Sequence, residues 1–169
     1  MSDDPGFTCT CCGGQHAELP LNYSTMAPDA WDPALETDPH SMLSSDQCVI
    51  GGEHFFVKGL IEIPVIGSGD VFSWGVWVSL SGTNFARALD LWETDGREAE
   101  EPYFGWLCTG LPVYGADTVN LKTRVHTRPV GQRPFIELEP TDHPLAVEQR
   151  TGITRERVRE IAAAVTHRA

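Results

Sequence analysis

The feature that most constrains the fold is the apolar run at residues 71–80, VFSWGVWVSL. It is rich in Val and Trp, and it lies between Gly-Ser-Gly-Asp and Ser-Gly-Thr-Asn, which both favour turns. The run lacks the apolar period of an amphipathic helix, and a short run of this kind is typical of a strand buried on both faces. We therefore expect residues 71–80 to form the central strand of the core.

Residues 48–65, which precede this run, are predicted to form another strand. Large apolar side chains alternate with other residues from Phe55 to Val65, so one face of this strand is expected to be buried. The connection at residues 67–70, Gly-Ser-Gly-Asp, is a hairpin signal. The two strands should therefore run antiparallel.

A helix is predicted over residues 83–94, directly after the central strand. Its apolar side chains, spaced as on one face of a helix, are Phe85, Ala88, Leu89 and Trp92. Ser81 or Thr83 can cap its first turn, since a hydroxyl oxygen there accepts a free backbone N–H. We expect this helix to lie on the sheet.

The remaining pattern predicts a single α+β domain with a mainly antiparallel sheet, one or two covering helices and a C-terminal helix. Further strands are expected at residues 103–107, 121–128 and 134–139, helices at residues 145–150 and 154–165, and one short helix near residues 28–35. The chain then divides into three parts. These are an acidic, loop-rich arm with a zinc-knuckle-like motif (1–50), a sheet core (51–140) and C-terminal helices (141–169).

Charge and hydropathy exclude several classes of protein. The net charge of the 169 residues is −12, whereas proteins that bind nucleic acid or anionic membranes need a basic face. No apolar run has the length of a membrane-spanning helix, and the first thirty residues lack the basic start of a signal peptide. We therefore expect a cytoplasmic protein that does not bind nucleic acid or membranes.

One concentrated basic patch is nevertheless present. Residues 118–136 contain no Asp or Glu, and the cations in or beside the strand expected there are Lys122, Arg124, Arg128 and Arg133. The patch could bind an anion or a protein partner. The alternative, which is the commoner role of such a patch, is that it pairs with the protein's own carboxylates in the arm or in the acidic loop at residues 93–101.

The N-terminal motif FTCTCCGGQH indicates a metal site. Cys9 and Cys12 can offer two thiolates to one ion, and the glycine that follows them lets the backbone turn around the sulfur atoms. A structural zinc site needs four ligands. From the remaining Cys and His residues we select His16, which is close in sequence, and Cys48, at the start of the first long strand. The expected cofactor is structural zinc.

Other interpretations of these cysteines remain open. The thiols could be free at the surface, or one of them could face the core. They could also act as a redox pair, although the motif does not lie at a strand-to-helix junction of a βαβ unit.

A group of acidic residues and a histidine suggests an alternative function, that of an enzyme. Asp142 and His143 are adjacent and follow Glu137 and Glu139, and a carboxylate beside an imidazole can support general-base chemistry, with or without a metal. The structural alternative is that Asp142 caps or turns the chain before the next helix.

The individual motifs combine into a recognisable family pattern. They are the CxxCGxxH start and the blocks SSDQCVI, HFFVKGLIEIPVIG, FSWGVWVSLS, PYFGWLC, NLKTRVHTRP and ELEPTDHPLAVEQRTGIT. Over nearly its full length the chain resembles the bacterial family DUF2199, a domain of unknown function. This resemblance implies a shared fold and a metal knuckle carried by Cys9, Cys12 and His16, but no particular activity. Cys11 and Cys108 lie outside the family pattern.

We therefore expect a cytoplasmic, zinc-stabilised protein that works by binding a protein partner. The surfaces that could bind the partner are the basic strand face and the acidic arm.

Overall fold

Two long strands, β6 (His54–Pro64) and β7 (Val71–Leu80), organise the computed structural model, which describes residues 7–8, 15–16 and 19–166. They pair antiparallel over their whole length, from Phe55 opposite Leu80 to Pro64 opposite Val71. Both faces of β7 contain fully buried side chains, Val76 on one and Trp77 on the other. The predicted central strand and the predicted hairpin are confirmed.

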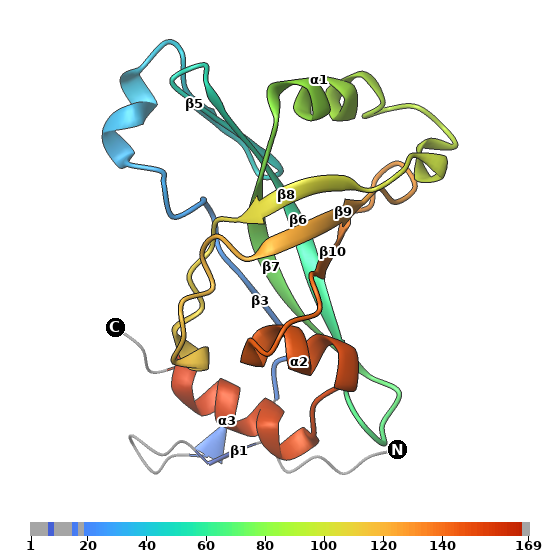
Figure 1. The fold of residues 1–169 in the computed structure, drawn as a ribbon. Coiled ribbons are helices and arrows are strands. Elements are labelled where there is room, and N and C mark those ends of the chain that lie inside the picture. Colours follow the sequence, from blue (N-terminus) through green and yellow to red (C-terminus); the bar gives the residue numbers. More distant parts are fainter. Residues whose placement is uncertain (1–6, 9–14, 17–18, 167–169) are drawn as a thin grey trace.

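Three further strands close this pair into a barrel. β8 (Tyr103–Leu107), β9 (Lys122–His126) and β10 (Phe135–Leu138) follow β7 as antiparallel neighbours, and β10 then pairs in parallel with β6 (Figure 1). The expected sheet is thus present, but it is closed by a parallel contact that the sequence did not predict. Closure leaves these five strands without a free edge.

A glycine permits this closure. Gly59 of β6 lies against β10, and a Cβ atom at this position would lie 2.5 Å from Cδ1 of Ile136 and 2.9 Å from the carbonyl oxygen of Pro134. The neighbouring amide of Leu60 donates to that same oxygen at 2.9 Å. The backbones therefore approach more closely here than any larger residue would allow.

Part of the N-terminal arm extends the sheet. β5 (Gln47–Ile50) pairs with β6, β4 (Met42–Leu43) pairs with β5, and β3 (Asn22–Ser24) runs parallel to β7. The prediction of one strand over residues 48–65 is wrong. Gly51 and Gly52 have φ values of 62° and 68°, so the chain turns between β5 and β6. A tight two-residue hairpin turn of type I′ requires positive φ at both of its central residues.

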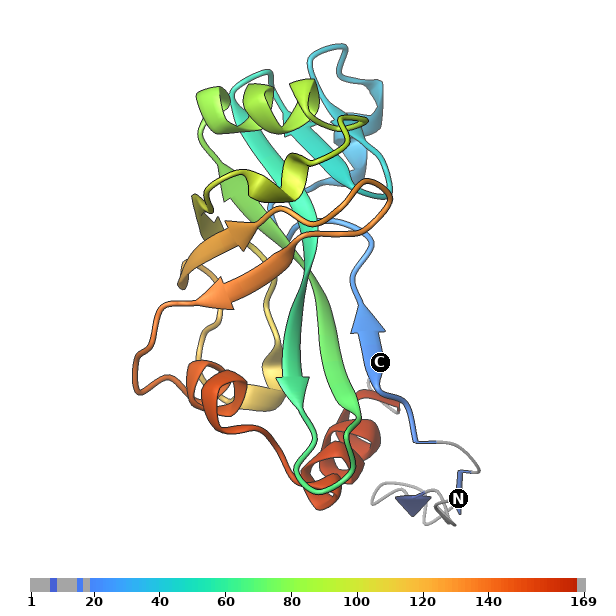
Figure 2. The same ribbon diagram turned by 90° about the vertical axis from the view of Figure 1, so that its right-hand side faces the viewer.

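Helices lie at both ends of the barrel (Figure 2). α1 (Gly82–Asp90) covers one end, and α2 (Pro144–Thr151) and α3 (Arg155–Thr166) lie at the other. Ser81 caps α1, because its Oγ accepts the N–H of Asn84 at 3.1 Å. α1 ends earlier than predicted, and Leu89 remains exposed. The short helix of the arm is a 3₁₀ helix, η1 (Pro33–Thr37), and two others are η2 (Arg97–Ala99) and η3 (Pro112–Tyr114).

The main core fills the barrel and continues to α2 and α3. Large side chains of β6 and β7 form its centre, and Leu145, Val158 and Ile161 from the two C-terminal helices close it. A smaller cluster lies on the other face of β6 and β7, where Phe56 and Trp77 pack with Cys48 of β5. The predicted C-terminal helices therefore cover the core as expected.

The start of the chain contributes a second, two-stranded sheet. β1 (Phe7–Thr8) and β2 (Gln15–His16) pair antiparallel, and β1 lies beside α3. The zinc-knuckle residues between these strands lie outside the described residues. Across the described ranges, none of the helices has the length and apolar character needed to cross a bilayer.

Candidate functional site

The outer face of β8 presents two aromatic side chains to solvent. Along this strand Tyr103, Gly105 and Leu107 point into the barrel, so Phe104 and Trp106 point outward. Their exposed fractions are 48% and 42%, and their rings meet edge to face with centroids 5.1 Å apart. Exposed aromatic side chains of this size on adjacent outward positions are typical of an interaction surface.

The neighbouring strand β9 adds two cations to this surface. Lys122 lies opposite Trp106 and Arg124 lies opposite Phe104 in the strand register. The Nζ atom of Lys122 is 6.0 Å from the centre of the Trp106 ring, at the limit for a favourable contact between a cation and an aromatic ring. Within the described part of the chain, neither cation forms an ion pair. We call these four residues the aromatic–basic face.

A groove of about 290 Å³ continues this face toward β10. Its lining residues are Phe104, Lys122, Thr123, Arg124, Glu137, Leu138, Glu139 and Pro140. Glu137 lies opposite Arg124 in the register, but its carboxylate bonds to Nε2 of His126 at 3.0 Å. The groove therefore has aromatic and basic side chains along one side and acidic side chains along the other.

The predicted basic patch is divided into two parts. Arg128 forms a two-bond ion pair with Glu62 of β6, at 2.5 and 3.1 Å, and Arg133 binds Asp46 at 2.7 Å. For these two arginines the interpretation that the patch pairs with the protein's own carboxylates is confirmed, and Asp46 belongs to the arm as expected. Glu62 was not anticipated. Lys122 and Arg124 alone remain on the outer strand face.

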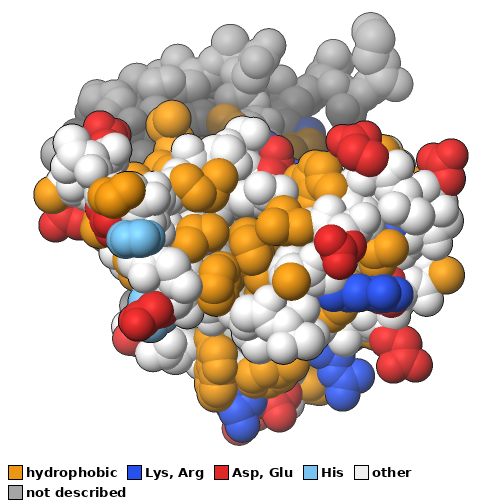
Figure 3. Space-filling model, turned by 90° about the horizontal axis from the view of Figure 1, so that it is seen from above, with side chains coloured by type: hydrophobic (Ala, Val, Ile, Leu, Met, Phe, Trp, Pro, Cys, Tyr) orange, Lys and Arg blue, Asp and Glu red, His pale blue; other side chains and the backbone are white. Residues whose placement is uncertain are grey.

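A second set of exposed apolar side chains lies at the α1 end of the barrel. Seen from above, apolar side chains occupy the middle of this surface and most charged side chains lie toward its margins (Figure 3). Exposed apolar side chains of the elements at this end include Met42 of β4 and Leu89 of α1. They belong to separate elements, whereas the aromatic–basic face lies on two adjacent strands and combines rings with cations.

His143 has a structural role at the start of α2. Its Nδ1 atom accepts the N–H of Leu145 at 3.1 Å, so Nε2 carries the proton and donates it to the carbonyl oxygen of Asp117 at 3.0 Å. The cap is thus His143, and Asp142 is exposed. Glu137 bonds to His126 instead, so the structure does not assemble the predicted acid–base group.

The predicted zinc ligands that the structure describes lie in different parts of the molecule. Cys9 and Cys12 lie outside the described residues, and of His16 the structure describes the backbone, in β2. Cys48 is fully buried between Phe56 and Trp77, and this burial raises the pKa of its thiol to about 11. The β1–β2 pair and β5 lie at opposite ends of the molecule (Figures 1 and 2).

The position of Cys48 decides whether it can belong to the same zinc site as His16. A cysteine binds zinc as a thiolate, and its sulfur must lie within reach of the other ligands. Cys48 therefore does not fit a site that also contains His16, while the ligation by Cys9, Cys12 and His16 stays a prediction. The described residues contain no cluster of three or more His, Cys, Asp or Glu side chains that could hold a metal.

Sequence reasoning missed two features of the structure, the outward rings of this surface and a buried arginine elsewhere. The sequence indicated an aromatic strand at residues 103–107, but it did not separate the inward ring of Tyr103 from the outward rings of Phe104 and Trp106. The signal was available, because strict alternation through Gly105 sends the two sets to opposite faces. Arg97, which lies in the acidic loop at residues 93–101, is buried although it is charged.

Comparison with known proteins gives one family. No curated protein and no solved structure matches the chain. The family described as "Uncharacterized protein conserved in bacteria (DUF2199)" matches residues 8–153, which include every strand of the barrel and the aromatic–basic face. The chain therefore belongs to the DUF2199 family.

Proposed function

We propose that this protein is an interaction module that binds an extended, acidic segment of a partner protein on its aromatic–basic face. The observation that carries the proposal is the pairing of two exposed rings, Phe104 and Trp106, with two cations that have no ion-pair partner in the described chain, Lys122 and Arg124. Apolar side chains of the partner would cover the rings, and its carboxylates would bind the cations.

The energetic basis is the burial of aromatic surface together with charge complementarity. Tryptophan and arginine are enriched among the residues that dominate binding energies. A tryptophan ring buries a large area, and the planar guanidinium of arginine donates several hydrogen bonds in a fixed geometry. The cations of the face would set the specificity and orientation of an acidic segment more than its affinity. The groove beside the face gives such a segment a path across β9 to β10.

A polypeptide fits this surface better than a nucleic acid does. Glu137 and Glu139 line the far side of the groove, and the chain as a whole carries a net charge of −12. A nucleic acid would place a phosphate charge at every nucleotide against these carboxylates. A peptide can place its few carboxylates opposite Lys122 and Arg124 and neutral or basic side chains opposite the two glutamates.

Zinc would have a structural role in this protein. The residues that would hold it are Cys9, Cys12 and His16, and the bound ion would supply a crosslink that ties the first residues of the chain together. The aromatic–basic face lies on strands of the barrel, so its recognition chemistry does not depend on the ion.

The experiment that tests the proposal is selection of a random-peptide display library on the purified protein, followed by affinity measurement for the enriched peptides. We expect enriched sequences in which Asp or Glu alternates with apolar residues. Their affinity should fall on the order of tenfold or more in Trp106→Ala, the range of a dominant interface residue. It should fall similarly in Arg124→Glu, because the charge reversal places a carboxylate against the acidic peptide. Arg150→Glu, the same charge reversal at an exposed position of α2, is the matched control and should bind normally.

Thermal unfolding of each variant separates loss of binding from loss of folding. The proposal fails if no peptide is enriched or if the two variants on the face bind as well as the Arg150→Glu control. It also fails if a labelled single-stranded oligonucleotide binds the face in the same buffer and the peptides do not.

A further inference from the structure

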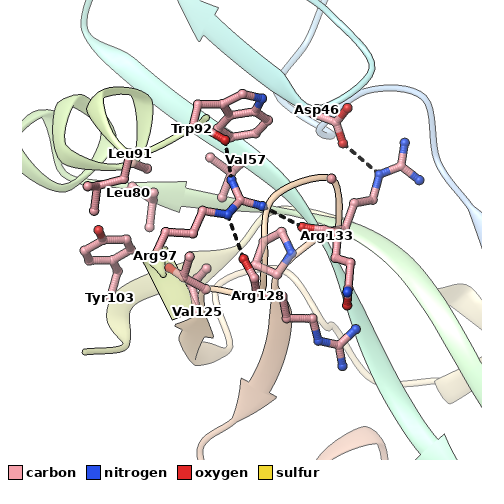
Figure 4. Close-up of a pocket in the computed structure, with 15 residues that line it drawn as sticks. Asp46, Val57, Leu80, Leu91, Trp92, Arg97, Tyr103, Val125, Arg128 and Arg133 are labelled. Atoms are coloured by element: carbon pink, nitrogen blue, oxygen red, sulfur yellow. Dashed lines mark hydrogen bonds and ion pairs between the residues drawn. The ribbon is translucent and has the colours of Figure 1, made fainter. Parts of the chain in front are cut away.

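A separate pocket lies between α1 and the barrel, away from the surface that binds the partner. Its volume is about 130 Å³. It is enclosed by the end of α1, by η2, by β8 and β9, and by the loop that joins β9 to β10 (Figure 4). The apolar side chains that line it include Val57, Leu80, Ala88, Leu91 and Val125.

Arg97 is the central polar group of this pocket. It is 8% exposed, and its guanidinium donates four hydrogen bonds to backbone oxygens. Nε bonds to Arg128 at 2.7 Å, Nη1 bonds to Trp92 at 2.9 Å, and Nη2 bonds to Pro129 at 3.1 Å and to Gln132 at 3.0 Å. A guanidinium carries five N–H groups, so one donor on Nη1 has no hydrogen-bond partner in the described chain.

The charge of Arg97 has no counter-ion in the described chain. The carboxylate that lines the same pocket, Asp46, bonds to Nε of Arg133 at 2.7 Å, and Arg128 is paired with Glu62. Carbonyl dipoles offset part of the cost of burying a cation, but they supply no negative charge. The pocket is therefore electropositive at Arg97 and would gain from an anion.

The walls around Arg97 are apolar. Figure 4 shows Leu80 and Leu91 on one side of Arg97, with Val57 and Val125 beside it. An apolar cavity of about 150 Å³ is known to bind benzene, so this pocket has room for one ring or a short branched chain. A ligand that satisfies both features has a small hydrocarbon body and a single negative charge.

We propose that this pocket binds a small organic carboxylate. Its carboxylate would accept the remaining N–H of Arg97, and its hydrocarbon part would lie against the leucine and valine side chains. The planar guanidinium suits this role, because its N–H groups match the geometry of carboxylate oxygens. The proposed binding is independent of the partner surface, since no residue of the aromatic–basic face lines the pocket.

The test is isothermal titration calorimetry of the full chain with benzoate, with benzamide as the neutral analogue of the same shape and with inorganic phosphate as a second anion. We expect saturable binding of benzoate and no detectable binding of benzamide or phosphate. Ala88→Leu fills the pocket from α1 and leaves Arg97 in place, and it should weaken benzoate binding on the order of tenfold or more.

Ala86→Leu is the matched control, because it makes the same change on the exposed face of the same helix. This variant should bind benzoate like the wild type. The proposal is overturned if benzoate and short branched carboxylates all fail to bind, if benzamide or phosphate binds as well as benzoate, or if Ala88→Leu binds benzoate as tightly as Ala86→Leu does.

Discussion

Arg97 donates its Nε–H to the backbone oxygen of Arg128 at 2.7 Å, which joins the segment after α1 to the end of β9. The same guanidinium also reaches Pro129 and Gln132, so one side chain holds most of the loop that leads to β10. This loop precedes the parallel contact that closes the barrel. The position of β10 therefore depends partly on a residue far away in sequence.

Replacing Arg97 by Met should destabilise the protein by about 2–4 kcal/mol, since four backbone carbonyl oxygens would lose charge-assisted hydrogen bonds. Arg97→Lys should recover little, because one ammonium group cannot reach carbonyls on both sides of the planar fork. Urea unfolding measures the free energy of unfolding of both variants. Arg150→Met, which removes an exposed arginine, is the control, and equal stability of the Arg97 and Arg150 variants would contradict the role of Arg97.

Gly59→Ala should be destabilising by about 2–4 kcal/mol, because the added Cβ would overlap Ile136 and the carbonyl of Pro134 at the barrel closure. Ile136 supplies the two closest atoms. A double-mutant cycle with Ile136→Ala measures this relation: Gly59→Ala should cost clearly less in the Ile136→Ala background. Additive effects of the two substitutions would show that the contact with Ile136 is not the cause.

The elements that could be predicted from sequence are those whose signal is local. The apolar run at residues 71–80 became β7 with the predicted bounds, and the amphipathic pattern at residues 154–165 became α3 with a shift of one residue at each end. The Gly51–Gly52 turn also had a local signal, since two adjacent glycines favour a hairpin, but the apolar residues on both sides concealed it.

The features that could not be predicted depend on contacts between distant segments. Arg97 lies in an acidic stretch that looks solvated, and its burial depends on carbonyls at residues 128–132. Cys48 looked available as a ligand because sequence does not show which face of β5 meets Trp77. The candidate face was half predicted: Lys122 and Arg124 alternate outward on β9, but Arg128 lies beyond its end and pairs with Glu62.

The pH dependence of stability should reveal the ion pair between Arg87 and Glu100. Bonds from Arg87, and then from the hydroxyl of Tyr103, lower the pKa of Glu100 from its ordinary value of 4.5. The folded protein therefore holds this proton less tightly than the unfolded chain does. The stabilisation is complete above the ordinary pKa and is lost as the pH falls through the lowered pKa.

Glu100→Gln removes this contribution, so the wild type should be the more stable protein at pH 7, and the difference should shrink at acidic pH. Chemical unfolding at a series of pH values measures this difference in stability. Arg87→Gln should reduce the same pH dependence, because Arg87 makes the largest contribution to the shift. A difference between wild type and Glu100→Gln that stays constant from pH 7 to pH 3 would contradict the assignment.

Metal content tests the N-terminal site and separates its predicted ligands. Protein purified without chelators or affinity metal should contain about one zinc ion per chain, the number that one four-ligand site holds. The double variant Cys9→Ser and Cys12→Ser should lose the zinc together with thermal stability, because binding of a structural metal contributes directly to folding. Cys48→Ala should keep the zinc, since Cys48 packs between Phe56 and Trp77 at the opposite end of the molecule from β2. Elemental mass spectrometry measures the zinc in all three proteins. Absence of zinc from the wild type would refute the site, whereas loss of zinc in Cys48→Ala would return Cys48 to the ligand set.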